Sequence, residues 1–186
     1  MNGTPRKTRS LRSIGPRGLT LIEACAALAV VGVLATAGMP SLKSTFERKT
    51  LQGLAAELAA DLHLARGDAV AQQAGVRVAA HAGDGGSCVV AYTGPADGCR
   101  CGGAAAPVCE AEATALRYRF VAASSGMVVS TNVGSLRFDP RLGTATPSGT
   151  LAIASASGAS VRHVVNMMDR VRSCSPGAGV SGFAAC

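Results

Sequence analysis

The sequence predicts an α+β protein in which a long N-terminal helix packs on a small antiparallel β-sheet domain. Residues 19–39 form an apolar run that contains one charge, Glu23. Leucine and alanine then recur every three or four residues as far as Ala65, which is typical of an amphipathic helix. Short runs rich in Val, Leu and Ile, separated by Gly-rich turns, follow from Val76 onward and predict strands.

The N-terminal region combines a basic segment with an apolar one. Residues 1–18 hold five basic side chains and no acid, and they show no apolar periodicity, so we interpret them as a basic leader. The 21 residues that follow, at about 1.5 Å per helical residue, match the roughly 30 Å hydrocarbon core of a bilayer. The basic flank favours a single membrane span with its N-terminus in the cytoplasm.

The hexapeptide Gly18-Leu-Thr-Leu-Ile-Glu23 resembles the prepilin peptidase site of type IV pilins and type II secretion pseudopilins, which is cleaved after the Gly. The resemblance extends to Gly32 and to Pro40, which falls where those proteins often carry a helix-bending proline. Leu19 departs from it, because Phe is the commoner first mature residue. The resemblance implies cleavage by prepilin peptidase between Gly18 and Leu19, removal of residues 1–18, and N-methylation of Leu19.

Glu23 is the single charge in the apolar run. A carboxylate near the edge of a bilayer core is unfavourable unless it is neutralised or paired. The resemblance implies that Glu23 pairs with the Leu19 amine of the neighbouring subunit as a filament assembles. A Glu23 that merely marks the membrane edge is the alternative.

The helix is expected to continue beyond the membrane. We predict a membrane-spanning and filament-core segment over residues 19–43, with a bend at Pro40, which lacks a backbone N–H and clashes with the preceding turn. Residues 44–75 are predicted to form an amphipathic helix of the globular domain that ends near Gly75. Its apolar stripe consists of Leu51, Leu54, Leu58, Leu62 and Ala65.

Residues 76–186 are predicted to form a β-rich domain. In one of its strands Arg117 and Arg119 alternate with Leu116, Tyr118 and Phe120. The two arginines should therefore face one side of the sheet, and these three residues the other side. The segment 94–107, rich in Gly, Ala and Pro, is predicted to be a loop. Strands are expected at residues 76–80, 87–92, 116–121, 127–130, 135–138, 151–154, 161–165 and 170–172.

The order of these elements resembles that of GspH/FimT-type minor pilins. The resemblance is carried by residues 58–70, 135–143, 151–153 and 161–172. It implies a minor pilin, a structural subunit at or near the tip of a type IV pilus. The subunit would lie in the bacterial inner membrane, with its C-terminal domain in the periplasm, before it enters the filament. A minor pseudopilin of a type II secretion system is the close alternative, and a FimT-like pilin that binds DNA is another. The implied partners are other pilins or pseudopilins and prepilin peptidase.

Six cysteines follow the apolar run, and Cys25 lies within it. In an oxidising compartment such cysteines persist as disulfides. Cys174 and Cys186 bracket a tail rich in Ser, Pro and Gly, and we expect them to pair. The spacing of the other four lacks the short gaps of a zinc knuckle, so we expect no metal there. Three pairings remain open for these four residues, Cys88, Cys99, Cys101 and Cys109.

No motif indicates catalysis. His63, His81 and His163 are scattered over the predicted helix and strands, and neither a nucleophile elbow nor a phosphate-binding loop is recognisable. We therefore expect a protein that is not an enzyme, with no catalytic residue and no cofactor.

Arginines near the C-terminus are candidate DNA contacts. On an extended strand Arg170 and Arg172 would face the same side about 6–7 Å apart, near the roughly 7 Å between successive phosphates. Residues 169–172 resemble the Gly-Arg-x-Arg of DNA-uptake FimT-like pilins, with Arg162 as support on the preceding strand. Asp169 stands where that motif has Gly, and an ion pair with Arg170 would turn the arginines inward. Two solvated arginines that protect an edge strand are the alternative.

Overall fold

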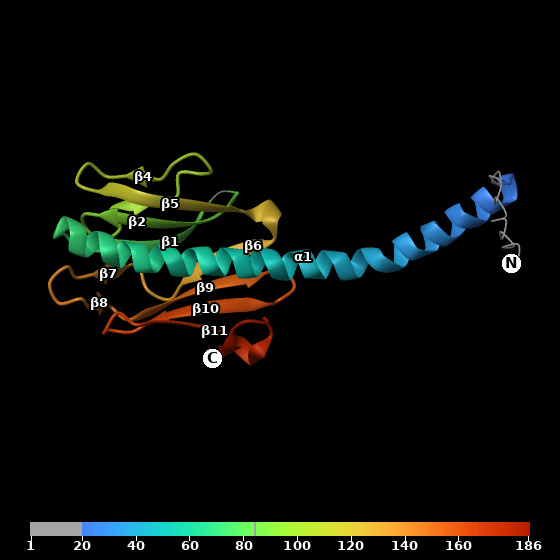
Figure 1. Cartoon of the computed structure of the whole chain (residues 1–186). Helices are drawn as coiled ribbons and strands as arrows, with labels where there is room; N and C mark the ends of the chain where they lie inside the picture. Colours follow the sequence, from blue (N-terminus) through green and yellow to red (C-terminus); the bar gives the residue numbers. More distant parts are fainter. Residues whose placement is uncertain (1–19, 84) are drawn as a thin grey trace, which may run out of the picture. The chain divides into compact units, whose positions relative to one another are not determined.

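The computed structural model describes residues 20–83 and 85–186, and the side chains of all of these except 35–41 and 178. The chain divides into two compact units, Met1–Leu42 and Lys43–Cys186. One helix, α1 (Leu21–Gln72), contributes residues to both (Figure 1). The predicted leader, residues 1–18, and the predicted cleavage site at Gly18 and Leu19 lie outside the described residues.

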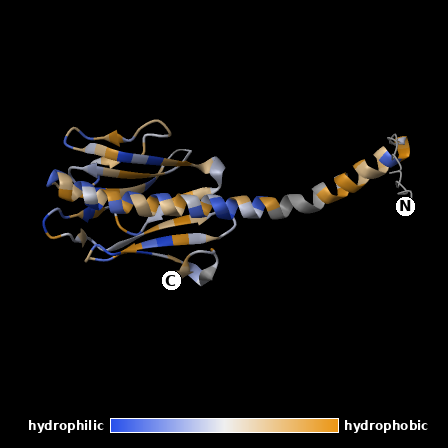
Figure 2. Cartoon of the chain, in the orientation of Figure 1, coloured by the Kyte–Doolittle hydropathy of each residue, from blue (hydrophilic) through white to orange (hydrophobic). Residues whose placement is uncertain are grey.

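In the unit Met1–Leu42 the described residues belong to the start of α1. Thr20 precedes the helix, and its Oγ1 accepts a hydrogen bond from the backbone N–H of Glu23 at 3.4 Å, as an N-cap hydroxyl does. The side chains of residues 21–34 are exposed. Most of these residues are apolar, as the colouring in Figure 2 shows. Across the described residues, no helix combines the length and the hydropathy of a membrane span. The predicted span over residues 19–39 extends past the described side chains at both ends, and the bend at Pro40 stays a prediction.

The unit Lys43–Cys186 contains two five-stranded sheets, and the strand orders are β5-β2-β1-β7-β8 and β12-β11-β10-β9-β6. The first sheet consists of β1 (Val76–Gly83), β2 (Gly86–Thr93), β5 (Thr114–Ala122), β7 (Leu136–Phe138) and β8 (Ala145–Thr146). The second consists of β6 (Met127–Thr131), β9 (Gly149–Ser155), β10 (Ser160–Val165), β11 (Val171–Ser175) and β12 (Ala184–Ala185).

The predicted α+β class with antiparallel strands is confirmed, because every pair except the parallel β11 and β12 is antiparallel. The strands form two sheets, where one was expected. The short strands β8 and β12 were not predicted.

The buried stripe of α1 packs against both sheets. Leu51, Leu58 and Leu62 belong to one core that also contains Val78 of β1 and Ile153 of β9. Full burial of one leucine contributes about 1.5–3 kcal/mol, so this stripe is a large part of the stabilisation. The predicted stripe is confirmed, although Leu54 is only partly buried.

The helix ends earlier than the predicted Gly75. Its last residue is Gln72, because Gln73 adopts a left-handed conformation (φ 52°) that cannot continue an α-helix.

A β-bulge at Leu116 changes the predicted facing of β5. The register between β2 and β5 shifts at this residue, so Leu116 packs toward the core that contains α1, whereas Tyr118 packs on the opposite face of the sheet. The two arginines of β5 face α1 and pair with its acids. Arg117 lies 2.5 Å from Asp68, and Arg119 lies 2.6 Å from Glu57 and 3.0 Å from Asp61.

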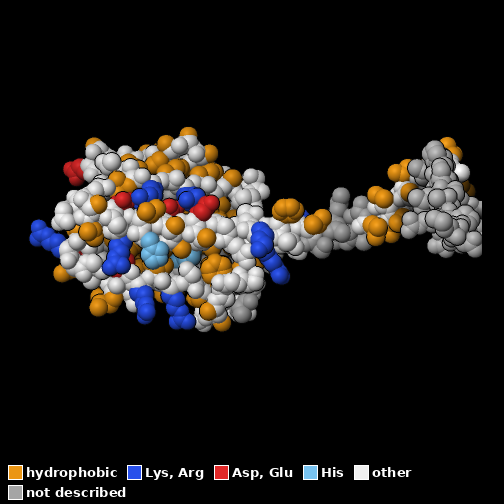
Figure 3. All heavy atoms as spheres, in the orientation of Figure 1, with side chains coloured by type: hydrophobic (Ala, Val, Ile, Leu, Met, Phe, Trp, Pro, Cys, Tyr) orange, Lys and Arg blue, Asp and Glu red, His pale blue; other side chains and the backbone are white. Residues whose placement is uncertain are grey.

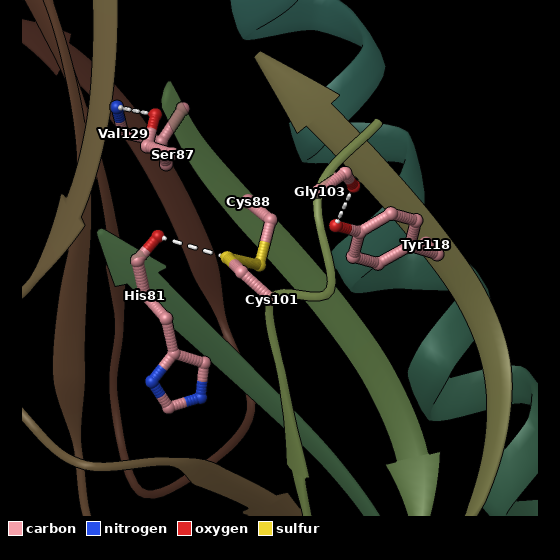
Figure 4. The surroundings of a disulfide bond; sticks show 7 residues. All are labelled: His81, Ser87, Cys88, Cys101, Gly103, Tyr118 and Val129. Carbon is pink, nitrogen blue, oxygen red and sulfur yellow. Dashed lines mark hydrogen bonds between the residues drawn. A yellow bond between two sulfur atoms is a disulfide. The ribbon is translucent and has the colours of Figure 1, made fainter. Parts of the chain in front are cut away.

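The opposite face of the first sheet is covered by residues 94–113, which we call the disulfide flap. It contains a two-stranded sheet that was not predicted, in which β3 (Cys99–Arg100) lies within the predicted loop 94–107 and β4 (Val108–Cys109) directly follows that loop. Two bridges, Cys88–Cys101 and Cys99–Cys109, select one of the three pairings that the sequence allowed. Figure 4 shows the disulfide Cys88–Cys101 joining β2 to the flap and the hydrogen bond from the Tyr118 hydroxyl to Gly103 O. The oxygen–oxygen distance of this hydrogen bond is 2.5 Å.

The C-terminal tail is fastened at both ends by the disulfide Cys174–Cys186, as predicted. Between the two cysteines Val180 is buried in the core. The side-chain amide of Gln52 on α1 donates a hydrogen bond to Ser181 O at 2.7 Å. The tail therefore packs against the helix.

The seventh cysteine, Cys25 of α1, forms no disulfide with a described residue and is exposed.

We predict that loss of the disulfides destabilises the unit Lys43–Cys186. Residues 44–186 produced alone should be soluble and should melt at a lower temperature in reductant. Replacing Cys174→Ser together with Cys186→Ser should lower the free energy of unfolding by about 2–5 kcal/mol, the usual effect of removing a native disulfide from a small secreted domain. Urea unfolding followed by circular dichroism measures the change. An identical melting temperature with and without reductant would contradict the pairing.

Candidate functional site

The outer face of the second sheet carries two of the three candidate arginines. Arg162 of β10 lies opposite Cys174 of β11, and Val164 lies opposite Arg172, so these four side chains share one face. Along β10, the exposed Arg162 and Val164 alternate with the buried Val161, His163 and Val165. The face that carries Arg162 and Val164 therefore points away from the core. Arg162 and Arg172 are both exposed there.

A groove of about 380 Å³ crosses this face. Ala152 of β9 lies between Arg162 on one side and Ser130 on the other, and its short side chain leaves the hollow. The lining side chains offer hydroxyl, amide and guanidinium donors and include no Asp or Glu, so these side chains suit an anion. It is lined by Ser130, Thr131, Asn132, Thr150, Ala152, Arg162, Val164, Cys174 and Cys186.

The turn between β10 and β11 determines where Arg170 lies. The N–H of Asp169 donates to Asn166 O at 2.9 Å, and the N–H of Arg170 donates to Asn166 Oδ1 at 2.8 Å. Asp169 adopts a left-handed conformation (φ 58°), which glycine adopts readily and aspartate tolerates. The sequence predicted that Arg170 begins a strand over residues 170–172. Strand β11 begins at Val171, so Arg170 belongs to the turn instead.

Asp169 turns toward the helix and not toward Arg170. Its carboxylate is buried and lies 2.5 Å from Nε of Arg66 on α1, whose own side chain is half exposed. The expected inward ion pair between Asp169 and Arg170 is therefore wrong. Arg162, Arg170 and Arg172 are exposed, and none of them forms an ion pair with another described residue.

Burial raises the pKa of Asp169 above its ordinary value, and the nearby Arg66 guanidinium opposes this rise, with a smaller effect from His63. Neither carboxylate oxygen makes an aligned hydrogen bond within the described part of the chain, so the close contact with Arg66 is its main compensation. Removing the partner of a charge buried in this way is strongly destabilising.

His163 is a structural residue. It is fully buried, and its Nδ1 lies 2.8 Å from Ser173 Oγ. Burial lowers its pKa to about 4, although the Ala55 carbonyl of α1 opposes the change, so the ring is neutral at pH 7. His63 is exposed and His81 partly buried. Over residues 20–83 and 85–186, no three or more His, Cys, Asp or Glu side chains are arranged to hold a metal.

The structure places Glu23 in the first turn of α1, exposed and without an ion pair to any described residue. Its predicted pairing with a neighbouring subunit stays a prediction. Sequence reasoning did not predict the contact between Arg66 and Asp169 or the polar groove. The sequence feature that could have indicated this contact is Asp169, which stands where the resembled motif has Gly. A carboxylate at such a turn position needs a cationic partner if it is buried.

Comparison with known protein families finds a match over much of the chain. The model of the family described as Type II transport protein GspH matches residues 54–169, more than half of the chain. The matched segment runs from the buried part of α1 to Asp169, so it excludes Glu23 and the arginines of the last hairpin arm, Arg170 and Arg172. No curated protein and no solved structure matches the chain.

We predict that Arg66→Gln destabilises the fold in a pH-dependent manner. In the wild type, the raised pKa of Asp169 means that stability is highest below its unfolded pKa and falls as the pH rises toward its folded pKa. Without Arg66 the folded pKa rises further, so the loss of stability extends to higher pH. The variant should match the wild type most closely near pH 4. It should be less stable by about 1–3 kcal/mol near pH 7, below the effect of a fully buried pair because Arg66 is half exposed.

Thermal or urea unfolding at several pH values measures this difference. Asp169→Asn is the matched control, since asparagine tolerates the left-handed conformation and carries no charge. In that background Arg66→Gln should have little pH-dependent effect. A constant difference between Arg66→Gln and wild type from pH 4 to pH 8 would contradict the argument.

Proposed function

This chain belongs to the GspH family of type II transport proteins, and from this premise we propose that it is a minor subunit of a filament built from pilin-like chains. The family description favours a minor pseudopilin of a type II secretion system. A minor pilin at or near the tip of a type IV pilus would use the same chemistry and is the alternative assignment. In either case the role is structural and not catalytic.

The observation that carries this proposal is the composition of α1. The described side chains of residues 21–34 are exposed and mostly apolar with one acid, Glu23, whereas residues 51–69 bury a stripe within a β-sheet unit. An exposed apolar helical surface needs a bilayer or other helices to cover it. We propose that residues 19–39 reside in the bacterial inner membrane before assembly and in the filament core afterwards.

The proposed topology has a cytoplasmic N-terminus and a periplasmic unit Lys43–Cys186. Three disulfides in that unit support an oxidising compartment. Prepilin peptidase would cleave between Gly18 and Leu19, after which Leu19 is N-methylated. Glu23 would pair with the Leu19 amine of a neighbouring pilin or pseudopilin, so that two charges unfavourable in the membrane form one neutral pair.

We predict that Glu23→Ala is inserted and cleaved normally but enters filaments poorly. Removing a charge makes the apolar run more hydrophobic, whereas it also removes the proposed partner of the Leu19 amine. N-terminal sequencing should begin at Leu19 in both wild type and variant, and the fraction of the variant in sheared filaments should fall. Glu110→Ala, which removes an exposed acid of the disulfide flap, is the matched control.

Two outcomes would contradict the proposal. A wild-type N-terminus at any residue other than Leu19 would remove its basis, and normal filament entry of Glu23→Ala would leave Glu23 as an interfacial marker.

A second candidate function, DNA binding, is favoured by the position of Asp169. Because its carboxylate pairs with Arg66, the exposed Arg170 is left without a neutralising partner, as are Arg172 and Arg162. Arg162 also lines the groove of hydrogen-bond donors on the outer face of the second sheet. Such a surface would contact phosphates and not base edges, so binding would be weak and independent of sequence.

We predict that residues 44–186 retard duplex DNA in a gel at about 50 mM salt and that Arg170→Gln with Arg172→Gln abolishes the shift. Two or three phosphate contacts give a log–log salt slope of about 2 to 3 in magnitude. Arg100→Gln, at an exposed position of the disulfide flap, is the matched control and should bind normally. If the wild type gives no shift, or if the double variant shifts the DNA equally, Arg170 and Arg172 are solvated surface residues that do not bind DNA.

A further inference from the structure

Two turns meet at one end of the unit Lys43–Cys186. One is the β7–β8 turn, residues 139–144, and the other is the β10–β11 turn, residues 166–170. The N–H of Ala145 donates to Met167 O at 3.1 Å, which ties the two together. Arg66 also reaches both, because its Nε contacts Asp169 and its Nη2 lies 3.8 Å from where a Cβ on Gly143 would stand. We call these two turns with Arg66 the two-turn tip.

The two-turn tip presents three large apolar side chains to solvent. Leu142 is 76% exposed, Met167 60% and Met168 78%. They belong neither to the core nor to the arginine face described above. Exposed apolar side chains scattered singly are ordinary, but here three lie on two segments that a backbone hydrogen bond joins. Figure 3 shows hydrophobic and basic side chains together at this end of the unit.

The charge around these side chains is cationic at the surface. Arg141 and Arg170 are exposed, and Arg66 is half exposed between the turns. Both acids of the tip are engaged within it. Asp169 is buried against Arg66, and Asp139 Oδ1 accepts hydrogen bonds from the N–H groups of Arg141 and Leu142, each at 2.9 Å. These bonds lower the pKa of Asp139 and hold its carboxylate against its own backbone. Three guanidinium groups, those of Arg66, Arg141 and Arg170, against these two carboxylates leave the tip with a net positive charge.

We propose that the two-turn tip docks on an anionic lipid surface. Leu142, Met167 and Met168 enter the boundary between headgroups and acyl chains, while Arg141, Arg170 and Arg66 contact lipid phosphates. A projecting apolar tip ringed by cations matches an interface whose negative charge overlies an apolar phase. Nucleic acid offers phosphates but no apolar phase that would cover the leucine and the methionines. The proposal does not depend on which filament the subunit enters.

The test uses the full-length protein in nanodiscs of phosphatidylcholine and measures its flotation with added vesicles. Vesicles that contain about 30% phosphatidylglycerol should capture the protein, those of phosphatidylcholine alone should capture it far less, and added salt should weaken capture. Met167→Ser with Met168→Ser should weaken capture about tenfold or more, because apolar burial is lost. Arg141→Gln should weaken it about fivefold, the fold-change expected for one basic residue near an anionic surface.

Matched controls distinguish the tip from the rest of the surface. Val128→Ser removes an exposed apolar side chain of β6, and Arg100→Gln removes an exposed arginine of the disulfide flap. Both should be captured like the wild type. The proposal is overturned if the wild type does not float with anionic vesicles, if both vesicle types capture it equally, or if the methionine double variant is captured as well as the wild type. Loss of capture in the double variant alone, with the controls unchanged, supports it.

Discussion

Burial of the α1 stripe is the interaction on which the unit Lys43–Cys186 depends. The two five-stranded sheets are separate hydrogen-bonded structures, and their side chains meet those of α1 in one core. Only 3% of the residues in the chain are aromatic, so each buried position removes a modest area from water. The three disulfides compensate for this thin core. One fastens the tail that packs on α1, one joins the flap to β2 of the first sheet, and one links β3 to β4 within the flap.

Charged contacts flank this stripe on both sides of the helix and restrict how α1 can lie. Toward the first sheet, Arg119 pairs with Glu57 and Asp61; such partly exposed pairs contribute about 0–1 kcal/mol each. Toward the second sheet, Arg66 pairs with the buried Asp169. This second contact differs in kind, because a buried carboxylate that loses its partner is strongly unfavourable. Among the charged contacts, the pair with Asp169 therefore contributes more to fixing α1 than the pairs with Arg119 do.

Local patterns in the sequence were enough for the α+β class, the apolar stripe and the Cys174–Cys186 pairing. They failed where the outcome depends on tertiary contacts. The bulge at Leu116 exists because β5 must satisfy α1 on one face and the flap on the other, which alternation alone does not reveal. The division into two sheets and the connectivity of the four clustered cysteines likewise follow from strand order. The contact of Arg66 with Asp169 was not predicted, because the sequence does not distinguish an arginine with a distant partner from a solvated arginine on the polar side of the helix.

Asp169 shows how one residue can join a turn to a distant element. Glycine would take the left-handed conformation here with no further requirement, whereas aspartate takes it and adds a carboxylate that must be compensated. The helix supplies that compensation through Arg66, so the turn that presents Arg170, Met167 and Met168 is held by α1 itself. The same helix carries Glu23 in its first turn. Loss of the Arg66 contact would therefore affect both this turn and the stability of the whole unit, because the buried carboxylate would lose its main compensation. The position of the arginines and methionines is in this way coupled to the packing of α1.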